Sequence, residues 1–145
     1  MPTRSAHTSW TGAIADGTGR VDLVSSGAGH FDVSYPRRAA DDAEGVTSPE
    51  ELIAAAHSAC YAMALTGAIG RAGATPIGLE VDAAVTLGPD PAGGSRITEI
   101  ALRVVGRVEG LDAAAFAELA ATAKAGCPVS KALAGTTITL EASLA

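Results

Sequence analysis

The residues of this chain best suited to chemistry are its two cysteines, Cys60 and Cys127. Cys127 directly precedes Pro128 at the expected start of a short helix, where free backbone amides favour a thiolate and lower the pKa of a thiol. Cys60 lies inside a long apolar segment that predicts a helix, so it needs a neighbouring cation instead, and the arginines are the available supply. The sequence therefore predicts thiol chemistry at two sites far apart in the chain.

Two other interpretations of the cysteines have to be weighed. Free cysteines are often small buried core residues, whereas a permanent disulfide is not expected in a reducing compartment. His57 precedes Cys60 by three residues and could ligate a metal ion together with both cysteines. A structural zinc site needs four ligands, usually in close pairs, and the remaining histidines, His7 and His30, do not supply them. We therefore expect no metal, and a packed or hydrogen-bonded core histidine at position 57.

Composition excludes several classes of protein. The chain has 145 residues, of which 48% are hydrophobic, and a net charge of -6. That apolar fraction is too high for a disordered chain, and the acidic balance disfavours nucleic-acid binding. The apolar run 52–69 contains His57 and Ser58 and is flanked by charges, which favours a core helix over a membrane span. No apolar leader precedes the domain, so we expect a cytoplasmic protein.

The order of predicted elements indicates the α+β class. Ser48 and Glu51 form a capping box around Pro49 and start a long helix, while Asp112 caps a second one. The alternating segments 79–87 and 99–108 form a hairpin. The expected strands are 7–10, 20–25, 31–33, 79–87, 99–108 and 137–144, the expected helices are 49–69, 113–124 and 128–133, and residues 35–47 form an exposed charged loop. We predict one domain, 1–145, with antiparallel sheets and a central buried helix.

Two segments carry a resemblance to a known family. Residues 48–60 (SPEELIAAAHSAC) and 123–130 (AKAGCPVS) resemble the two cysteine motifs of the OsmC/Ohr family of hydroperoxide reductases. The segments Glu-Glu-Leu and Ala-His-Ser-Ala-Cys within residues 48–60 resemble the OsmC branch of the family more closely than the Ohr branch. The early Trp10, the chain length and the closing strand fit as well, so the similarity covers nearly the whole chain.

This resemblance implies an intertwined α+β homodimer whose two active sites lie at the subunit interface. It implies that Cys60 attacks a peroxide and becomes a sulfenic acid, and that Cys127 then condenses with it to form a disulfide. An external dithiol resets the pair, and no cofactor is needed. The expected substrate is an organic hydroperoxide, with hydrogen peroxide also possible, and the expected role is defence against oxidative or osmotic stress.

The resemblance also implies an arginine that stabilises the thiolate and a glutamate that holds the arginine. Glu50 matches the motif, but it precedes Cys60 by ten residues, which is about 15 Å along a helix axis. Either the arginine bridges this gap, or Glu50 serves the site of the other subunit. Arg38 is the first candidate for the arginine, Arg37 the second and Arg20 the third.

Two rival functions stay open at this stage. A non-catalytic dimeric protein could bind an apolar ligand in a cleft lined by residues such as Met63 and Leu65, with both cysteines as packing residues. A redox sensor could change its partner binding when a disulfide forms. Accessible thiolate chemistry at Cys60, with Cys127 within disulfide reach, distinguishes the peroxidase from the binding protein.

Overall fold

A computed structural model describes residues 1–145 and divides them into two units, 1–52 and 53–145. Helices and strands occur together, so the predicted α+β class is confirmed. The helix α2 (Pro49–Arg71) begins in the first unit and continues without a break into the second. The prediction of a single domain is not tested by this division, because one helix belongs to both units.

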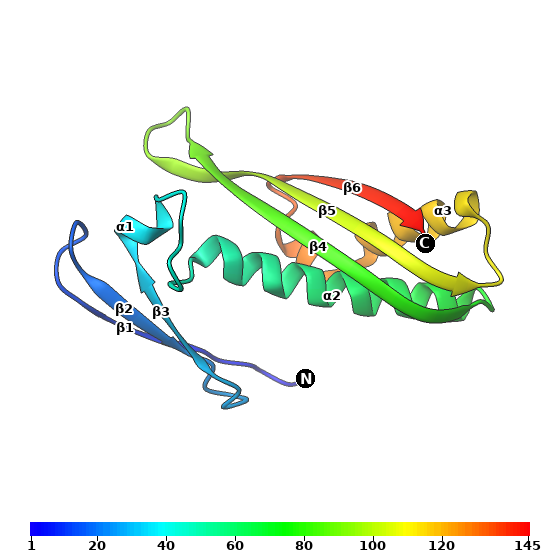
Figure 1. Cartoon of the computed structure of the whole chain (residues 1–145), viewed down its shortest axis with the longest axis horizontal. Coiled ribbons are helices and arrows are strands. Elements are labelled where there is room, and N and C mark those ends of the chain that lie inside the picture. The colour runs from blue at the N-terminus through cyan, green and yellow to red at the C-terminus, as the bar shows by residue number, and fades with distance from the viewer. The chain divides into compact units, whose positions relative to one another are not determined.

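The first unit contains a three-stranded antiparallel sheet, drawn in blue in Figure 1. Its strands are β1 (His7–Thr11), β2 (Thr18–Asp22) and β3 (His30–Ser34). The sequence placed the second strand too late, at 20–25. The chain turns directly after Asp22, where the amide of Gly27 donates to the carbonyl of Leu23, and Gly27 takes the positive φ of 64° that this turn requires.

The segment expected as a loop begins with one helical turn, α1 (Tyr35–Arg38). The hydroxyl of Ser34 accepts a hydrogen bond from the amide of Arg37 at 3.3 Å, and Pro36 occupies the first turn. Residues 39–45 after it are exposed, as the charged sequence predicted. Arg37 and Arg38 lie in this helical turn.

The start of α2 is close to the prediction. The hydroxyl of Ser48 accepts from the amide of Glu51 at 3.1 Å, as expected of the cap. The reciprocal half of the capping box is not formed, because the carboxylate of Glu51 accepts from the hydroxyl of Thr47 instead.

The second unit contains a three-stranded sheet in the order β4-β5-β6. The strands β4 (Thr75–Pro89) and β5 (Ser95–Glu109) form the predicted antiparallel hairpin and are longer than expected. The strand β6 (Thr137–Leu144) pairs parallel to β5, so this sheet is mixed and not purely antiparallel. The helices between β5 and β6 carry the chain back across the sheet, which allows parallel pairing.

Two helices connect β5 to β6. The helix α3 (Ala113–Gly126) is capped by Asp112, whose carboxylate accepts from the amide of Ala115 at 2.8 Å, as predicted. The short helix α4 (Pro128–Ala132) follows, with Cys127 at its N-cap. A Cβ atom built on Gly106 of β5 would lie 2.6 Å from the ring of Phe116, so the absence of a side chain at position 106 lets α3 approach the strand closely.

The cluster of buried apolar residues lies in the second unit. It consists of one face of α2, the inner face of α3 and the central strand. The buried cluster comprises Tyr61, Leu65, Ala68, Ile69, Ala74, Leu102, Val104, Phe116, Ala120, Ala123 and Cys127.

The opposite face of α2 is apolar and uncovered. By length and composition alone α2 is apolar enough to cross a membrane, and only 28% of its most apolar window is buried. Ala55, Ala59 and Met63 follow one another at four-residue spacing on the exposed side, and Met63 is 75% exposed. The sequence predicted a buried central helix, and the structure buries one side of it.

Candidate active site

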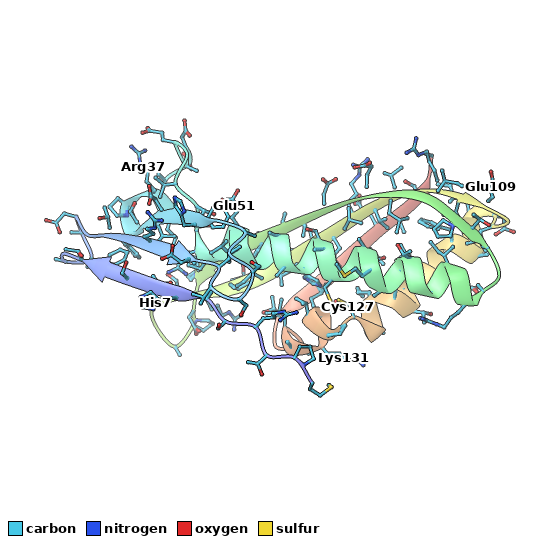
Figure 2. All side chains as sticks on the ribbon, turned by 90° about the horizontal axis from the view of Figure 1, so that it is seen from below. His7, Arg37, Glu51, Glu109, Cys127 and Lys131 are labelled. Atoms are coloured by element: carbon cyan, nitrogen blue, oxygen red, sulfur yellow. The ribbon has the colours of Figure 1, made fainter.

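The two cysteines come together in the second unit. Cys60 lies on α2 and is half-buried. Cys127 lies at the start of α4, where Figure 2 labels it, and is fully buried. Both are free thiols, and each contributes to the pKa shift of the other, so their side chains are neighbours. The structure therefore joins the two residues that the sequence singled out for thiol chemistry.

The two thiols have different acidities. Burial raises the pKa of Cys60, and the neighbouring Cys127 raises it further. The backbone amide of Val129 lowers this pKa, but the net shift is upward. Burial acts in the same direction on Cys127, but the amide of Ser130, the thiol of Cys60 and the hydroxyl of Ser130 together bring its pKa below the ordinary value. Cys127 makes no regular capping bond to the helix. Within this unit the negative charge is therefore favoured on Cys127.

His57 is a core histidine, as predicted, and it has a specific partner. It is fully buried, and its Nε2 lies 2.7 Å from the hydroxyl oxygen of Ser130. Its Nδ1 has no hydrogen-bond partner. Burial lowers the pKa of His57, so the ring is neutral at neutral pH. Sequence analysis missed Ser130, although its position three residues after Cys127 was a usable signal.

Arg38 and Glu50 form an ion pair in the first unit. The Nε of Arg38 donates to both carboxylate oxygens of Glu50, and its Nη2 donates to Oε1 at 2.6 Å. The hydrogen bond from Arg38 holds the pKa of Glu50 below its ordinary value, and the same bond raises the pKa of Arg38. The pair is permanently ionised at neutral pH, and Nη1 of Arg38 makes no hydrogen bond.

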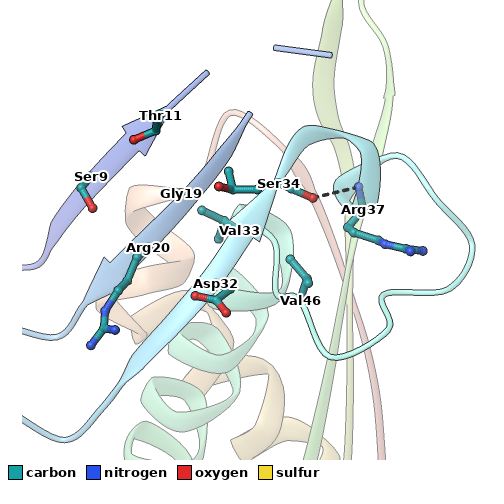
Figure 3. A pocket seen from close by; sticks show the side chains of 10 residues that line it. Ser9, Thr11, Gly19, Arg20, Asp32, Val33, Ser34, Arg37 and Val46 are labelled. Atoms are coloured by element: carbon teal, nitrogen blue, oxygen red, sulfur yellow. Dashed lines mark hydrogen bonds between the residues drawn. The ribbon is translucent and has the colours of Figure 1, made fainter. Parts of the chain in front are cut away.

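The other two candidate arginines lie elsewhere in the same unit. Arg37 pairs with Glu44 of the exposed loop, and Arg20 pairs with Asp22 at 3.3 Å. Both line a polar pocket of about 510 Å³ beside β2 and β3, which Figure 3 shows with Asp32 in its wall. Only Arg38, of the three, contacts Glu50.

A second pocket of the first unit has apolar walls. Its volume is about 380 Å³, and Arg38 is one of the residues that line it. The sequence marked Trp10 as a family feature but did not predict this pocket, because the strands and the turn that form it are far apart in sequence. Its lining includes Trp10, Ile14, Val21, Val33, Tyr35 and Leu52.

Metal binding has no support in the geometry. No group of three or more histidine, cysteine, aspartate or glutamate side chains is placed to hold an ion. His57, Cys60 and Cys127, which the sequence considered together, are held by hydrogen bonds and packing.

Comparison with known proteins relates this chain to peroxiredoxins and organic hydroperoxide resistance proteins. Residues 41–141 match the model of the family described as OsmC-like protein. Peroxiredoxin OsmC of Escherichia coli (strain K12) is 42% identical over 124 residues, which cover 86% of this chain and 85% of that protein.

Solved structures agree with the sequence relatives. An organic hydroperoxide resistance protein from Elizabethkingia anophelis is 28% identical, with a TM-score of 0.82 over 100% of this chain and 98% of that one. The organic hydroperoxide resistance protein OhrB of Bacillus subtilis is 30% identical, with a TM-score of 0.75 over 96% of this chain and 98% of that one.

The fold, the dithiol and these relatives define a peroxidase-like oxidoreductase. The chain belongs to the OsmC family, which confirms the resemblance drawn from the two cysteine motifs. The relatives favour an enzyme over the apolar-ligand binding protein that the sequence left as an alternative.

Proposed function

We propose that this protein reduces organic hydroperoxides through a disulfide between Cys60 and Cys127. The Cys60 thiolate attacks the terminal peroxide oxygen, the O–O bond breaks, and the alkoxide takes a proton and leaves as an alcohol. The Cys127 thiolate then attacks the sulfur of the Cys60 sulfenic acid. The S–S bond forms, the S–O bond breaks, and hydroxide takes a proton and leaves as water. The observation that carries this proposal is the contact between a half-exposed and a buried thiol.

Activation of Cys60 requires a positive charge that the second unit does not supply. Burial raises the pKa of Cys60, and no cation contributes to its environment there. We assign this role to Arg38, because Glu50 holds its guanidinium by three hydrogen bonds and leaves Nη1 free to face an anion. Arg37, tied to Glu44, is the weaker candidate. Glu50 acts as the residue that positions Arg38, within its own chain or for a second copy.

The apolar pocket beside Arg38 supports the organic class of substrate. A hydrocarbon group can bury surface against Trp10, Tyr35 and Leu52 while the peroxide group stays near the guanidinium. Hydrogen peroxide has no group to place there, so cumene hydroperoxide is expected to give the higher kcat/KM. An external dithiol, which the chemistry requires, then reduces the disulfide.

We further propose that the working form is a homodimer. The first unit leaves large apolar side chains in water, among them Trp10, Ile14 and Phe31 at 43%, 63% and 39% exposure. The exposed stripe of α2 around Met63 is a second uncovered apolar surface. In this proposal a second copy of the chain covers both apolar surfaces. Light scattering of the purified protein measures its molar mass and tests whether it is a dimer. The cytoplasmic location and the role in oxidative or osmotic stress defence stay predictions of the sequence.

Hydroperoxide consumption by purified protein with a dithiol reductant tests the function. Wild type is expected to turn over cumene hydroperoxide, and Cys60→Ser is expected to lose even one turnover. Cys127→Ser is expected to complete one turnover and to stop at a sulfenic acid that dimedone traps. Consumption by Cys60→Ser at the wild-type rate, or thiols that react only after unfolding, would refute the proposal.

A further inference from the structure

A buried hydrogen bond ties the two cysteine-bearing segments together. His57 lies on α2 three residues before Cys60, and Ser130 lies on α4 three residues after Cys127. The bond between His57 Nε2 and Ser130 Oγ, 2.7 Å long, therefore joins the helix that carries Cys60 to the segment that follows Cys127. Both side chains are buried, at 0% and 7% exposure. The reaction proposed above assigns neither residue a task.

The donor in the hydrogen bond between His57 and Ser130 can be inferred from the atom of His57 that has no partner. Nδ1 of His57 is buried without a partner. A buried N–H without an acceptor is rarer than a buried acceptor without a donor, which favours the tautomer that carries its proton on Nε2. In that tautomer His57 donates to Ser130. The single hydroxyl proton of Ser130 is then free to point at Cys127, and the hydroxyl contributes to the stabilisation of that thiolate.

We propose that His57 and Ser130 are positioning residues that hold Cys127 as the attacking thiolate in the disulfide-forming step; this rests on the proposed peroxidase function. His57 orients the hydroxyl of Ser130, and Ser130 donates to the sulfur. In the step itself the Cys127 sulfur forms the S–S bond, and the oxygen of the Cys60 sulfenic acid leaves with a proton as water. The oxidant is the hydroperoxide already consumed by Cys60.

Three other groups bear on the charge of Cys127. The thiol of Cys60 on α2 lowers the pKa of Cys127. Burial, and to a smaller extent Cys127, raises the pKa of the phenol of Tyr61, which donates to the carbonyl of Ala120. The imidazole of His57 acts through Ser130 and is neutral. No lysine or arginine contributes to the Cys127 environment. Ser130 and its partner are therefore the neutral donors on which the thiolate depends.

Titration of Cys127 tests the proposal without any peroxide. In the Cys60→Ser background, ultraviolet absorbance of the thiolate gives the midpoint, and Ser130→Ala is expected to raise it by about one pH unit. His57→Leu is expected to shift it in the same direction, and His57→Gln and Ser130→Thr, which keep donors, are expected to shift it less. Ser58→Ala removes a hydroxyl that bonds only to the carbonyl of Ala55 on the same helix, and serves as the matched control with no shift.

A single-turnover experiment then separates this role from a purely structural one. With one equivalent of cumene hydroperoxide, Ser130→Ala should oxidise Cys60 at the wild-type rate. At neutral pH it should form the disulfide about three-fold more slowly. A smaller fraction of Cys127 is then ionised, and the higher nucleophilicity of the less acidic thiol offsets only part of that loss. Above both pKa values the variant should be about three-fold faster than wild type, because the thiolate fractions are then equal and only the higher nucleophilicity remains. An unshifted titration, or slowing by the same factor at every pH, overturns this inference alone. Failure of wild type to consume hydroperoxide overturns the proposed function instead, and with it the assigned step.

Discussion

The two units of the chain differ in how far they bury their apolar side chains. Residues 53–145 bury a cluster of apolar side chains that includes Leu65 and Phe116 at 0% exposure, and both cysteines pack into or against it. In residues 1–52 the only buried large apolar side chain is Val21, and every residue of β1 is exposed. The first unit nevertheless contains the best-formed ion pair, between Arg38 and Glu50.

This difference separates two requirements of the chemistry. A sulfenic acid lasts longer when it is shielded, and Cys127 must be held in one place, which a packed core provides. A guanidinium is costly to bury and works best on a surface that another molecule can cover. The chain thus places both cysteines in the packed unit 53–145 and the Arg38–Glu50 ion pair in the more exposed unit 1–52.

The largest expected effect is loss of the packed core. Leu65→Ala removes a fully buried side chain and is expected to lower the free energy of unfolding by about 3 kcal/mol. Val24→Ala, in an exposed turn of the first unit, is expected to change it by less than about 0.5 kcal/mol. Urea unfolding followed by circular dichroism measures both. Equal losses would contradict the difference in burial between Leu65 and Val24.

Removal of the positive charge of Arg38 is expected to lower the rate of reaction with hydroperoxide and to leave the fold intact. Arg38→Met should lower the second-order rate constant for cumene hydroperoxide by about 10²-fold, since a preorganised cation no longer stabilises the reacting thiolate. Arg37→Met is the matched control next to it, and because its partner Glu44 is exposed, a change of less than about two-fold is expected. Stopped-flow oxidation measures both, and a larger loss in Arg37→Met would reverse the assignment.

Acid is expected to act on the two units in different pH ranges. The pKa of His57 is lowered from an ordinary value of 6.5, so the unfolded chain binds the proton more readily and stability falls as pH drops below about 6.5. The pKa of Glu50 is lowered from 4.5, so its contribution is present above that value and is lost only as pH falls below it. Each slope is at most about 1.4 kcal/mol per pH unit.

Denaturant unfolding as a function of pH resolves these ranges. His57→Gln should flatten the dependence between about pH 6.5 and 4.5 and leave the steeper acid limb in place. Glu50→Gln should flatten the dependence below about pH 4.5 and leave the dependence between about pH 6.5 and 4.5 in place. A single slope lost in both variants would show that the two groups titrate as one system.

The smallest expected effects come from the helix caps, one in each unit. Ser48→Ala and Asp112→Ala each remove a side chain that accepts from a first-turn amide, and each is expected to cost about 1 kcal/mol of stability. Because Ser48 starts the helix next to Glu50, only Ser48→Ala is expected to reduce peroxidase activity as well. Parallel melting and rate measurements check this, and an equal activity loss in Asp112→Ala would count against a local effect.

Local signals in the sequence were sufficient for much of this fold. Both caps, the hairpin β4-β5 and the two cysteine segments depend on neighbouring residues or on regular periodicity, and they were found. The parallel pairing of β6 with β5 was not found, because period-two alternation does not encode strand direction. The contact between His57 and Ser130 joins residues 73 apart, and no local pattern specifies it.

The close approach of α3 to β5 at Gly106 has a consequence for how this protein can vary. Any side chain at position 106 meets the ring of Phe116 and, at 3.2 Å, a methyl group of Leu79. In a library of random variants, single substitutions at 106 should therefore be depleted almost as strongly as changes at the cysteines. Alanine at 106 should return only alongside a smaller residue at 116, such as leucine, so that the two positions covary although they lie on different elements.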